Sequence, residues 1–205
     1  LLPWVVPGGA PVGVVCVGRG GVGANRARVV AGLGAKVTIL AVNLARLEYL
    51  SDIMPSNVTA LYIDEVTLEN CLTTADITVG AVLIPGAMAP KLIKRRHLKI
   101  MKPGSVLVDV AIDQGGCCET SRATTHSDPI FSVAGITHYC VANMPGAYAR
   151  TATFALNNAT VGYGLKLAAG GEKACRDKPG LKDGLHMSTG AITFKPVAGA
   201  FDMMR

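Results

Sequence analysis

Short apolar runs separated by turn-forming residues recur along this 205-residue chain. They are rich in Val, Ile and Leu, and they alternate little between apolar and polar positions. Continuous apolar runs of this length are typical of parallel β-strands that are covered on both faces. The pattern predicts six strands, at Val12–Val17, Lys36–Leu40, Val58–Tyr62, Ile77–Leu83, Ser105–Val110 and Thr137–Ala142.

Helical spacing of apolar residues lies between most of these runs. Asn43 is a suitable cap for a helix that runs from Leu44 to Met54. Three more helices are predicted, at Ala24–Leu33, Glu65–Thr74 and Pro90–Met101. Strands that alternate with helices predict an α/β fold with a doubly wound parallel sheet, in the Rossmann strand order 3-2-1-4-5-6.

The carboxyl-terminal part of the chain follows a different pattern. Apolar residues at helical spacing predict one long helix from Arg150 to Ala168, which ends at the Gly170-Gly171 pair. The remaining residues predict a further short helix, turns and a strand pair near Ile192 to Phe194. This part is too small to form an independent domain. We therefore divide the chain into a sheet domain and a carboxyl-terminal helical segment, at residues 1–149 and 150–205.

A glycine-rich turn joins the first predicted strand to the first predicted helix. Gly18, Gly20 and Gly23 have the G-x-G-x-x-G spacing, and Gly21 lies among them. The first glycine permits a tight turn, the second lets a pyrophosphate approach the backbone, and the third lets the helix pack on its strand. Unpaired N–H groups and the positive end of the helix dipole favour a phosphate there. In this context the motif predicts dinucleotide binding.

Composition narrows the class of protein further. Hydrophobic residues make up 50% of the chain and charged residues 17%, which supports a large core. The apolar stretches are of strand length and the first residues lack the pattern of a signal peptide, so we expect a soluble, cytoplasmic protein without membrane contact. The six cysteines form no C-x-x-C pair, which favours buried thiols over a zinc site or disulfides. A redox-active pair at Cys117 and Cys118 is the alternative.

The formal charge of +6 raises the question of nucleic-acid binding. In the densest basic cluster, apolar residues recur at helical spacing between the charges, so we interpret the cluster as a solvated helix face. Aromatic residues make up only 5% of the chain and offer no stacking platform, which argues against nucleic acid as a partner. The cluster consists of Lys91, Lys94, Arg95, Arg96, His97, Lys99 and Lys102.

Several strings of residues are more specific than the general fold. They are Ile84–Ala87 with Ala89–Leu92, Met101–Ser105, Val108–Cys117, His138–Pro145 and Thr151–Thr160. These strings closely resemble bacterial alanine dehydrogenases, and the resemblance covers essentially the whole chain. It corresponds to the NAD-binding domain of that family plus its carboxyl-terminal segment. The amino-terminal catalytic half of the family has no counterpart in these residues.

The resemblance implies a reaction and a set of site residues. The reaction is the reversible oxidative deamination of L-alanine to pyruvate and ammonium with NAD, in a homo-oligomer that is usually a hexamer. Asp113 matches the catalytic aspartate of the family, and Arg46 matches a position near the adenosine end of the cofactor. The residues implied to line the nicotinamide side are Val82, Leu83, Val110, Ile112, Asp113, Arg122, Val141, Asn143 and Met144.

The residue types themselves leave alternatives at three of these positions. Asp113 is a carboxylate suited to the proton transfers of deamination, but it could instead cap a turn or bind a ribose hydroxyl. The amide of Asn143 could orient the cofactor or the substrate, and it could equally stabilise a turn. Arg122 fits a phosphate contact or a structural contact better than a catalytic role.

Position 41 departs from the expected pattern. Rossmann sites place Asp or Glu about 20 residues after the glycines, where the carboxylate holds the ribose hydroxyls. This chain has Ala41 there, which should weaken the binding of NAD and reduce discrimination against NADP. Arg19 and Arg46 could attract the 2′-phosphate of NADP. We therefore expect NAD as the cofactor, with NADP accepted as well.

Two other functions compete with an alanine dehydrogenase. One is the nucleotide-binding domain of a proton-translocating transhydrogenase, which the stretch His138–Thr160 disfavours. The other is a non-catalytic dinucleotide-binding module, which Ala41 and the missing catalytic half favour. We expect this chain alone to bind dinucleotide but barely to turn over alanine. Its four histidines are expected to be structural or exposed, and they are His97, His126, His138 and His186.

Overall fold

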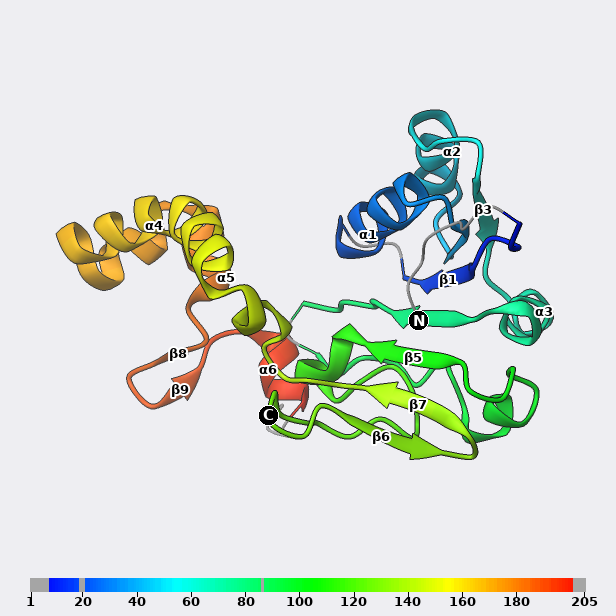
Figure 1. Cartoon of the computed structure of the whole chain (residues 1–205). Coiled ribbons are helices and arrows are strands. Elements are labelled where there is room, and N and C mark those ends of the chain that lie inside the picture. Colours follow the sequence, from blue (N-terminus) through cyan, green and yellow to red (C-terminus); the bar gives the residue numbers. More distant parts are fainter. Residues whose placement is uncertain (1–7, 19–20, 86, 201–205) are drawn as a thin grey trace. The chain divides into compact units, whose positions relative to one another are not determined.

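The computed structural model describes residues 8–18, 21–85 and 87–200 (Figure 1). They belong to two compact units. Among the described residues, the first unit contains those up to 83 and residues 89–142, and the second contains those between 84 and 88 and residues 143–200. The division at residue 149 remains a prediction.

A seven-stranded sheet forms the centre of the first unit, in the order β3-β2-β1-β4-β5-β7-β6. Its strands are parallel except for β6. The predicted doubly wound α/β fold is confirmed, and β7 takes the place predicted for the sixth strand. The strands are β1 (Gly13–Val17), β2 (Lys36–Ala41), β3 (Val58–Tyr62), β4 (Ile77–Gly80), β5 (Val106–Asp109), β6 (Ile130–Val133) and β7 (Ile136–Tyr139).

The edge strand β6 was not predicted. It pairs antiparallel with β7 through a hairpin whose turn residues, Ala134 and Gly135, have positive φ angles of 52° and 77°. Two consecutive positive φ angles are typical of the short turns that connect antiparallel strands. The run Ile130–Val133 has only four residues, which is too short for its apolar pattern to predict a strand. It becomes a strand by pairing with β7, which follows it.

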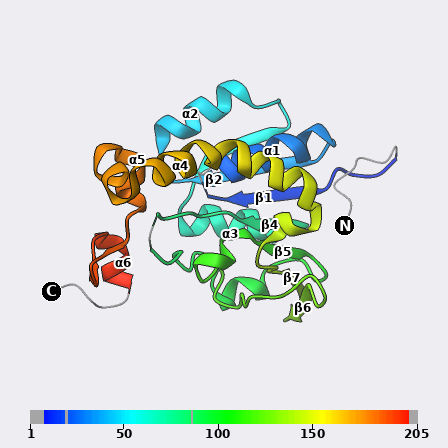
Figure 2. The same cartoon turned by 90° about the vertical axis from the view of Figure 1, so that its left-hand side faces the viewer.

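Helices cover both faces of the sheet (Figure 2). Val14 and Cys16 of β1 belong to a core cluster that includes alanines of α1 and Leu50 of α2. Val15 and Val17, which point to the opposite face, pack in a cluster with Leu68 and Leu72 of α3. The three helices are α1 (Gly21–Gly32), α2 (Leu44–Ile53) and α3 (Glu65–Thr74).

The fourth predicted helix, at Pro90–Met101, is wrong. Only a short 3-10 helix, η1 (Arg95–Lys99), forms there. The backbone before it is extended and bonds to a remote segment: the N–H of Ala89 donates to Gln114 at 2.9 Å, and the N–H of Ile93 donates to Cys117 at 3.1 Å. A helix that starts at Pro90 would need the N–H of Ile93 to bond to the carbonyl of Ala89, and that N–H is bonded to Cys117 instead.

The second unit is mainly helical (Figure 1). The predicted long helix is confirmed up to Gly171, where φ 52° and ψ −137° interrupt it. The predicted strand pair is confirmed as a small hairpin. The elements are η3 (Met144–Tyr148), α4 (Ala149–Asp177), α5 (Pro179–Gly184), β8 (Met187–Ser188), β9 (Ala191–Ile192) and α6 (Lys195–Ala200).

Large apolar side chains lie exposed on α4. They include Phe154, Leu156 and Leu165, each at least 60% exposed. Even so, none of the helices in the described part of the chain is both long and apolar enough to cross a membrane.

Candidate functional site

The glycine turn after β1 is built against the backbone that follows β4. Gly18 has a φ of 126°, and a Cβ atom there would lie 2.5 Å from the carbonyl oxygen of Ala81 and 2.9 Å from the nitrogen of Val82. The N–H of Gly18 donates to Leu40 at 3.0 Å, so the end of β2 is tied to the same point. Only glycine fits this position, as the tight turn in the sequence prediction requires.

The third glycine of the motif is equally constrained. A Cβ atom on Gly23 would lie 2.8 Å from the carbonyl oxygen of Gly18, so the close packing of α1 against the turn is confirmed. Gly21 is the first residue of α1. Gly20 and Arg19 lie outside the described residues. The N–H groups in the first turn of a helix have no partner within the helix, and they are available to an anion.

Most predicted site residues of the first unit follow the carboxyl ends of its parallel strands. Because β1, β2, β4, β5 and β7 are parallel, these ends share one edge of the sheet. Ligands of doubly wound sheets bind at this edge. Arg46 lies in the first turn of α2, after β2. The other positions are Val82 and Leu83 after β4, Val110, Ile112 and Asp113 in the 3-10 helix η2 (Val110–Gln114) after β5, and Val141 after β7.

The exposure of these residues differs, and Arg46, Val82 and Val110 are partly buried. Leu83 is 69% exposed and Asp113 is exposed, so their side chains are accessible to a ligand. Val141 and Ile112 are only 1% and 8% exposed. A ligand at this edge would therefore meet the backbone of Val141 and Ile112 rather than their side chains.

Arg122 lies beside the unpredicted edge strand. Its guanidinium carbon is 4.2 Å from the centre of the Phe131 ring, and that ring stacks on His138 at 4.9 Å. A cation over an aromatic face is held by the quadrupole of the ring. This contact supports the structural alternative for Arg122 and leaves its exposed side chain accessible to a phosphate.

Asn143 and Met144 belong to the second unit. Asn143 has left-handed backbone angles, φ 58° and ψ 52°, and its carbonyl accepts a hydrogen bond from Gly146 at 2.9 Å. Asn tolerates this conformation better than most residues. The geometry supports the turn alternative for Asn143. Its contact with a cofactor remains a prediction.

Asp109, at the end of β5, is a buried carboxylate that sequence reasoning missed. Its side chain has 0% exposure. It accepts hydrogen bonds from the N–H groups of Ala111 at 3.1 Å, Cys117 at 2.9 Å and Cys118 at 3.1 Å, and from the Ser121 hydroxyl at 2.6 Å. The only signal in the sequence is a carboxylate inside an apolar run, which requires partners when it is buried. Three of those partners, Cys117, Cys118 and Ser121, lie in the loop that follows η2 rather than next to Asp109 in the sequence.

The two adjacent cysteines pack in the core around this carboxylate. Both are buried, and the Cys117 thiol donates to Asp109 at 3.5 Å. Burial raises the pKa of the Cys117 thiol, and the nearby Asp109 carboxylate raises it further. The thiolate is the reactive form of cysteine, so this environment favours inert buried thiols over the redox-active alternative. The Cys117 sulfur also leaves no room for a side chain at position 80, because a Cβ atom on Gly80 would overlap it.

The histidines are structural or exposed, as predicted. His138 is buried, its Nε2 lies 2.8 Å from the Thr120 hydroxyl, and its Nδ1 lies 3.0 Å from the carbonyl oxygen of Ile136. Burial lowers the pKa of the His138 imidazole, which favours its neutral form. His126 and His186 are exposed.

The interpretation of residues 91–102 as a solvated basic face is wrong at His97. His97 is only 1% exposed; its Nδ1 accepts a hydrogen bond from the N–H of Lys94 at 3.1 Å, and its Nε2 lies 3.0 Å from Glu65 Oε1. Lys91 is exposed, as predicted, and its ammonium group also donates to backbone carbonyls, including that of Gly116 at 2.8 Å. Lys94 and Arg96 form ion pairs with Glu65.

Glu65, Glu69 and His97 are close enough together to be considered as metal ligands. However, the Nδ1 atom of His97 accepts a hydrogen bond, so the ring proton of the neutral imidazole is on Nε2, the atom that faces the carboxylates. A protonated nitrogen cannot bind a metal. The Glu65 carboxylate is also neutralised by Arg96. We therefore assign this cluster to the packing of α3 against η1.

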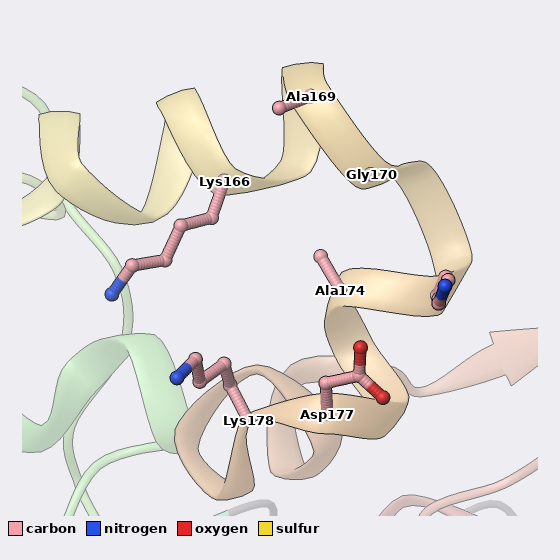
Figure 3. Close-up of a pocket in the computed structure, with 7 residues that line it drawn as sticks. Lys166, Ala169, Gly170, Ala174, Asp177 and Lys178 are labelled. Carbon is pink, nitrogen blue, oxygen red and sulfur yellow. The ribbon is translucent and has the colours of Figure 1, made fainter.

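The second unit contains an open pocket of about 260 Å³ (Figure 3). It lies between the two parts of α4 and the start of α5, and the Lys166 and Lys178 side chains extend toward the same space. None of its lining residues was predicted as a site residue. They are Lys166, Ala169, Gly170, Lys173, Ala174, Asp177 and Lys178.

The parallel sheet, its crossing helices and the glycine turn define a Rossmann-type α/β domain. Residues 2–195 match the family described as "Alanine dehydrogenase/PNT, C-terminal domain". The chain therefore belongs to this family, and the resemblance noted in the sequence is confirmed.

Individual relatives agree with this assignment. The chain is 51% identical to the alanine dehydrogenase of Halomonas elongata over 99% of its own length and 55% of that protein. A solved L-alanine dehydrogenase superimposes with a TM-score of 0.86 at 43% identity, over 99% of this chain and 56% of that one. A solved transhydrogenase from Sinorhizobium meliloti reaches 0.65 at 28% identity, over 75% of this chain and 44% of that one. The chain thus spans about half the length of the curated relatives it matches.

Proposed function

We propose that this chain is the cofactor-binding half of an L-alanine dehydrogenase. The enzyme would catalyse the reversible oxidative deamination of L-alanine to pyruvate and ammonium with NAD. The observation that carries the proposal is the glycine turn, fitted against Ala81 and Val82 at the same sheet edge as Asp113, in a chain about half identical to alanine dehydrogenases. Assembly as a homo-oligomer, such as a hexamer, and a cytoplasmic location belong to the same proposal.

The shape of the turn fits the diphosphate of a nicotinamide dinucleotide. Gly18 and Gly23 present backbone without side chains, and α1 starts at the same place. The partial positive charge at the start of a helix favours an anion. When bound, NAD supplies the acceptor for the hydride that leaves the substrate. Arg46 at the start of α2 and Arg122 beside Phe131 are the proposed contacts for the adenosine end and for a phosphate.

Asp113 is the proposed catalytic residue. It is exposed and follows β5 at the ligand edge of the sheet. Deamination requires addition of water to an imino acid and several proton transfers, and a carboxylate at this position can hold or move those protons. The residues that bind the substrate carboxylate are expected from a second, amino-terminal domain, as the resemblance implies.

Ala41 leads to a prediction about cofactor choice. It ends β2, where a carboxylate would hold the ribose hydroxyls, so the native chain should bind NAD and NADP with dissociation constants within about tenfold of each other. Ala41→Asp should shift the preference toward NAD, while Ala45→Asp, on the exposed side of α2, should not. Isothermal titration of both cofactors checks this. A strong NAD preference in the native chain would contradict the prediction.

The proposed L-alanine dehydrogenase activity is tested on the full-length native protein. Asp113→Asn should lower kcat for L-alanine by about 10²- to 10⁴-fold, the usual contribution of a general acid or base, and leave NADH binding nearly unchanged. Asp128→Asn, at another exposed aspartate of the first unit, is the matched control and should keep full activity. NADH formation at 340 nm is the measurement. Absence of alanine-dependent NADH formation by the native protein would favour the transhydrogenase or the non-catalytic module.

A further inference from the structure

The peptide group between Gly116 and Cys117 is held at both of its ends. The carbonyl oxygen of Gly116 accepts a hydrogen bond from Lys91 Nζ at 2.8 Å, and the N–H of Cys117 donates to Asp109 Oδ2 at 2.9 Å. The described chain contains no cis peptide bonds, so the C=O and the N–H of this group point in opposite directions. A cation thus faces the oxygen and an anion faces the hydrogen of one peptide dipole.

The same two side chains hold the neighbouring peptide groups. Lys91 Nζ also donates to the carbonyl oxygens of Gly115 and Cys118, and Asp109 also accepts from the N–H of Cys118 at 3.1 Å. Hydrogen bonds to charged groups are stronger than those between neutral groups. We call Lys91, Asp109 and the backbone of residues 115–118 the loop clamp.

The loop clamp fixes the segment that carries Asp113 at both ends. Before Asp113, Asp109 Oδ1 accepts from the N–H of Ala111 at 3.1 Å and caps η2. After it, Gly115 and Gly116 have φ angles of 85° and 78°, which turn the chain back toward Asp109. A Cβ atom on Gly116 would lie 2.8 Å from Asp109 Oδ2, so the carboxylate fills the space that glycine leaves.

Lys91 reaches the loop because the segment around it is extended rather than helical. Residues 89–93 run alongside residues 114–119: Ala89 donates to Gln114, Ile93 donates to Cys117, and Glu119 donates to Ile93 at 2.9 Å. This pairing places the Lys91 ammonium group against carbonyls that no helix or strand uses. The lysine is therefore part of the loop structure and does not simply provide surface charge.

We propose that Lys91 is a positioning residue which, together with Asp109, holds Asp113 at the ligand edge of the sheet. The link from Lys91 to catalysis rests on the proposed function, in which Asp113 is the catalytic residue. The claim that Lys91 orders residues 115–118 does not depend on that function. Loss of the ammonium group should loosen the loop and lower kcat, and leave the glycine turn and its dinucleotide contact in place.

The first arm of the test is amide hydrogen exchange on the full 205-residue chain. Lys91→Met should speed exchange at Gly115–Cys118 by about tenfold, because loss of a charged partner lowers the local opening free energy. Lys91→Arg, which keeps the charge and the donors, should restore most of the protection. Lys99→Met removes the same charge from another exposed lysine, in η1, and should have no effect there. Equal exchange in Lys91→Met and Lys99→Met, or a uniform increase over the whole sheet, overturns the proposal.

The second arm of the test measures L-alanine turnover by the full-length native protein. Lys91→Met should lower kcat for L-alanine by about tenfold or more and leave KM for NAD within about twofold, because the glycine turn that is proposed to bind the diphosphate does not depend on Lys91. Faster exchange with unchanged kcat overturns the link to Asp113. Absence of alanine turnover in the native protein refutes the proposed function, and the exchange arm then still decides whether Lys91 orders the loop.

Discussion

Replacing Gly18 with alanine is expected to raise the dissociation constant for NADH by at least about 100-fold. The new methyl group would overlap the backbone at Ala81 and Val82, and alanine would also be strained at the positive φ of this turn. Overlap and strain each cost about 1–3 kcal/mol, and every 1.4 kcal/mol changes an equilibrium constant tenfold. The turn can relieve both by moving, but it then no longer presents its backbone to the diphosphate. Fluorescence titration with NADH is the measurement.

Gly32→Ala provides the matched control for this substitution. Gly32 is the last residue of α1, and a Cβ atom there would have no heavy atom within 4 Å apart from the helix's own backbone. Alanine at this position should leave the affinity for NADH within about twofold of the native value, as expected for a surface change away from any special feature. If Gly18→Ala bound NADH as tightly as Gly32→Ala, the glycine turn would not be the diphosphate site.

Replacing Asp109 with alanine is expected to lower the free energy of unfolding by about 3–5 kcal/mol. Three N–H groups and the Ser121 hydroxyl would lose their acceptor in the core, and each buried donor without a partner costs about 1–3 kcal/mol. Relaxation of the loop toward water should offset part of the sum. Urea denaturation followed by circular dichroism measures the effect on the full chain.

Two further variants make the Asp109 result specific. Asp52→Ala removes an exposed carboxylate from α2 and should change the free energy of unfolding by less than about 0.5 kcal/mol. Asp109→Asn keeps one oxygen as an acceptor and should fall between the native chain and Asp109→Ala. If Asp109→Ala unfolded at the same urea concentration as Asp52→Ala, the buried carboxylate would contribute nothing to the loop.

The sequence predicts those parts of the fold whose cause is local. Buried parallel strands are continuous apolar runs, so β1–β5 and β7 follow from the sequence. The glycine spacing likewise predicts a tight turn at Gly18, although its contacts with Ala81 and Val82 are visible only in the structure. The segment 90–101 looks helical by its own spacing. It is extended because Ala89 and Ile93 find their partners at Gln114 and Cys117, which no local pattern reveals.

The candidate site divides in the same way. The glycine positions could be predicted from the sequence because their spacing has a steric reason. Asp113 was predicted only from the resemblance to alanine dehydrogenases, since residue spacing alone does not single it out. Asp109 and Lys91 were missed because most of their partners are backbone groups, mainly those of residues 115–118. A carboxylate and an ammonium group that bind mainly backbone leave no oppositely charged side chain for a sequence pattern to show.

The contact between Gly18 and the backbone at Ala81 and Val82 also limits how the protein can be redesigned. Neither turn can gain side-chain volume unless the other moves, so variant libraries that randomise one of them alone will consist mostly of inactive members. Position 41, at the end of β2, lies outside this contact. Directed evolution toward a chosen nicotinamide nucleotide should therefore begin at Ala41 and leave both turns as they are.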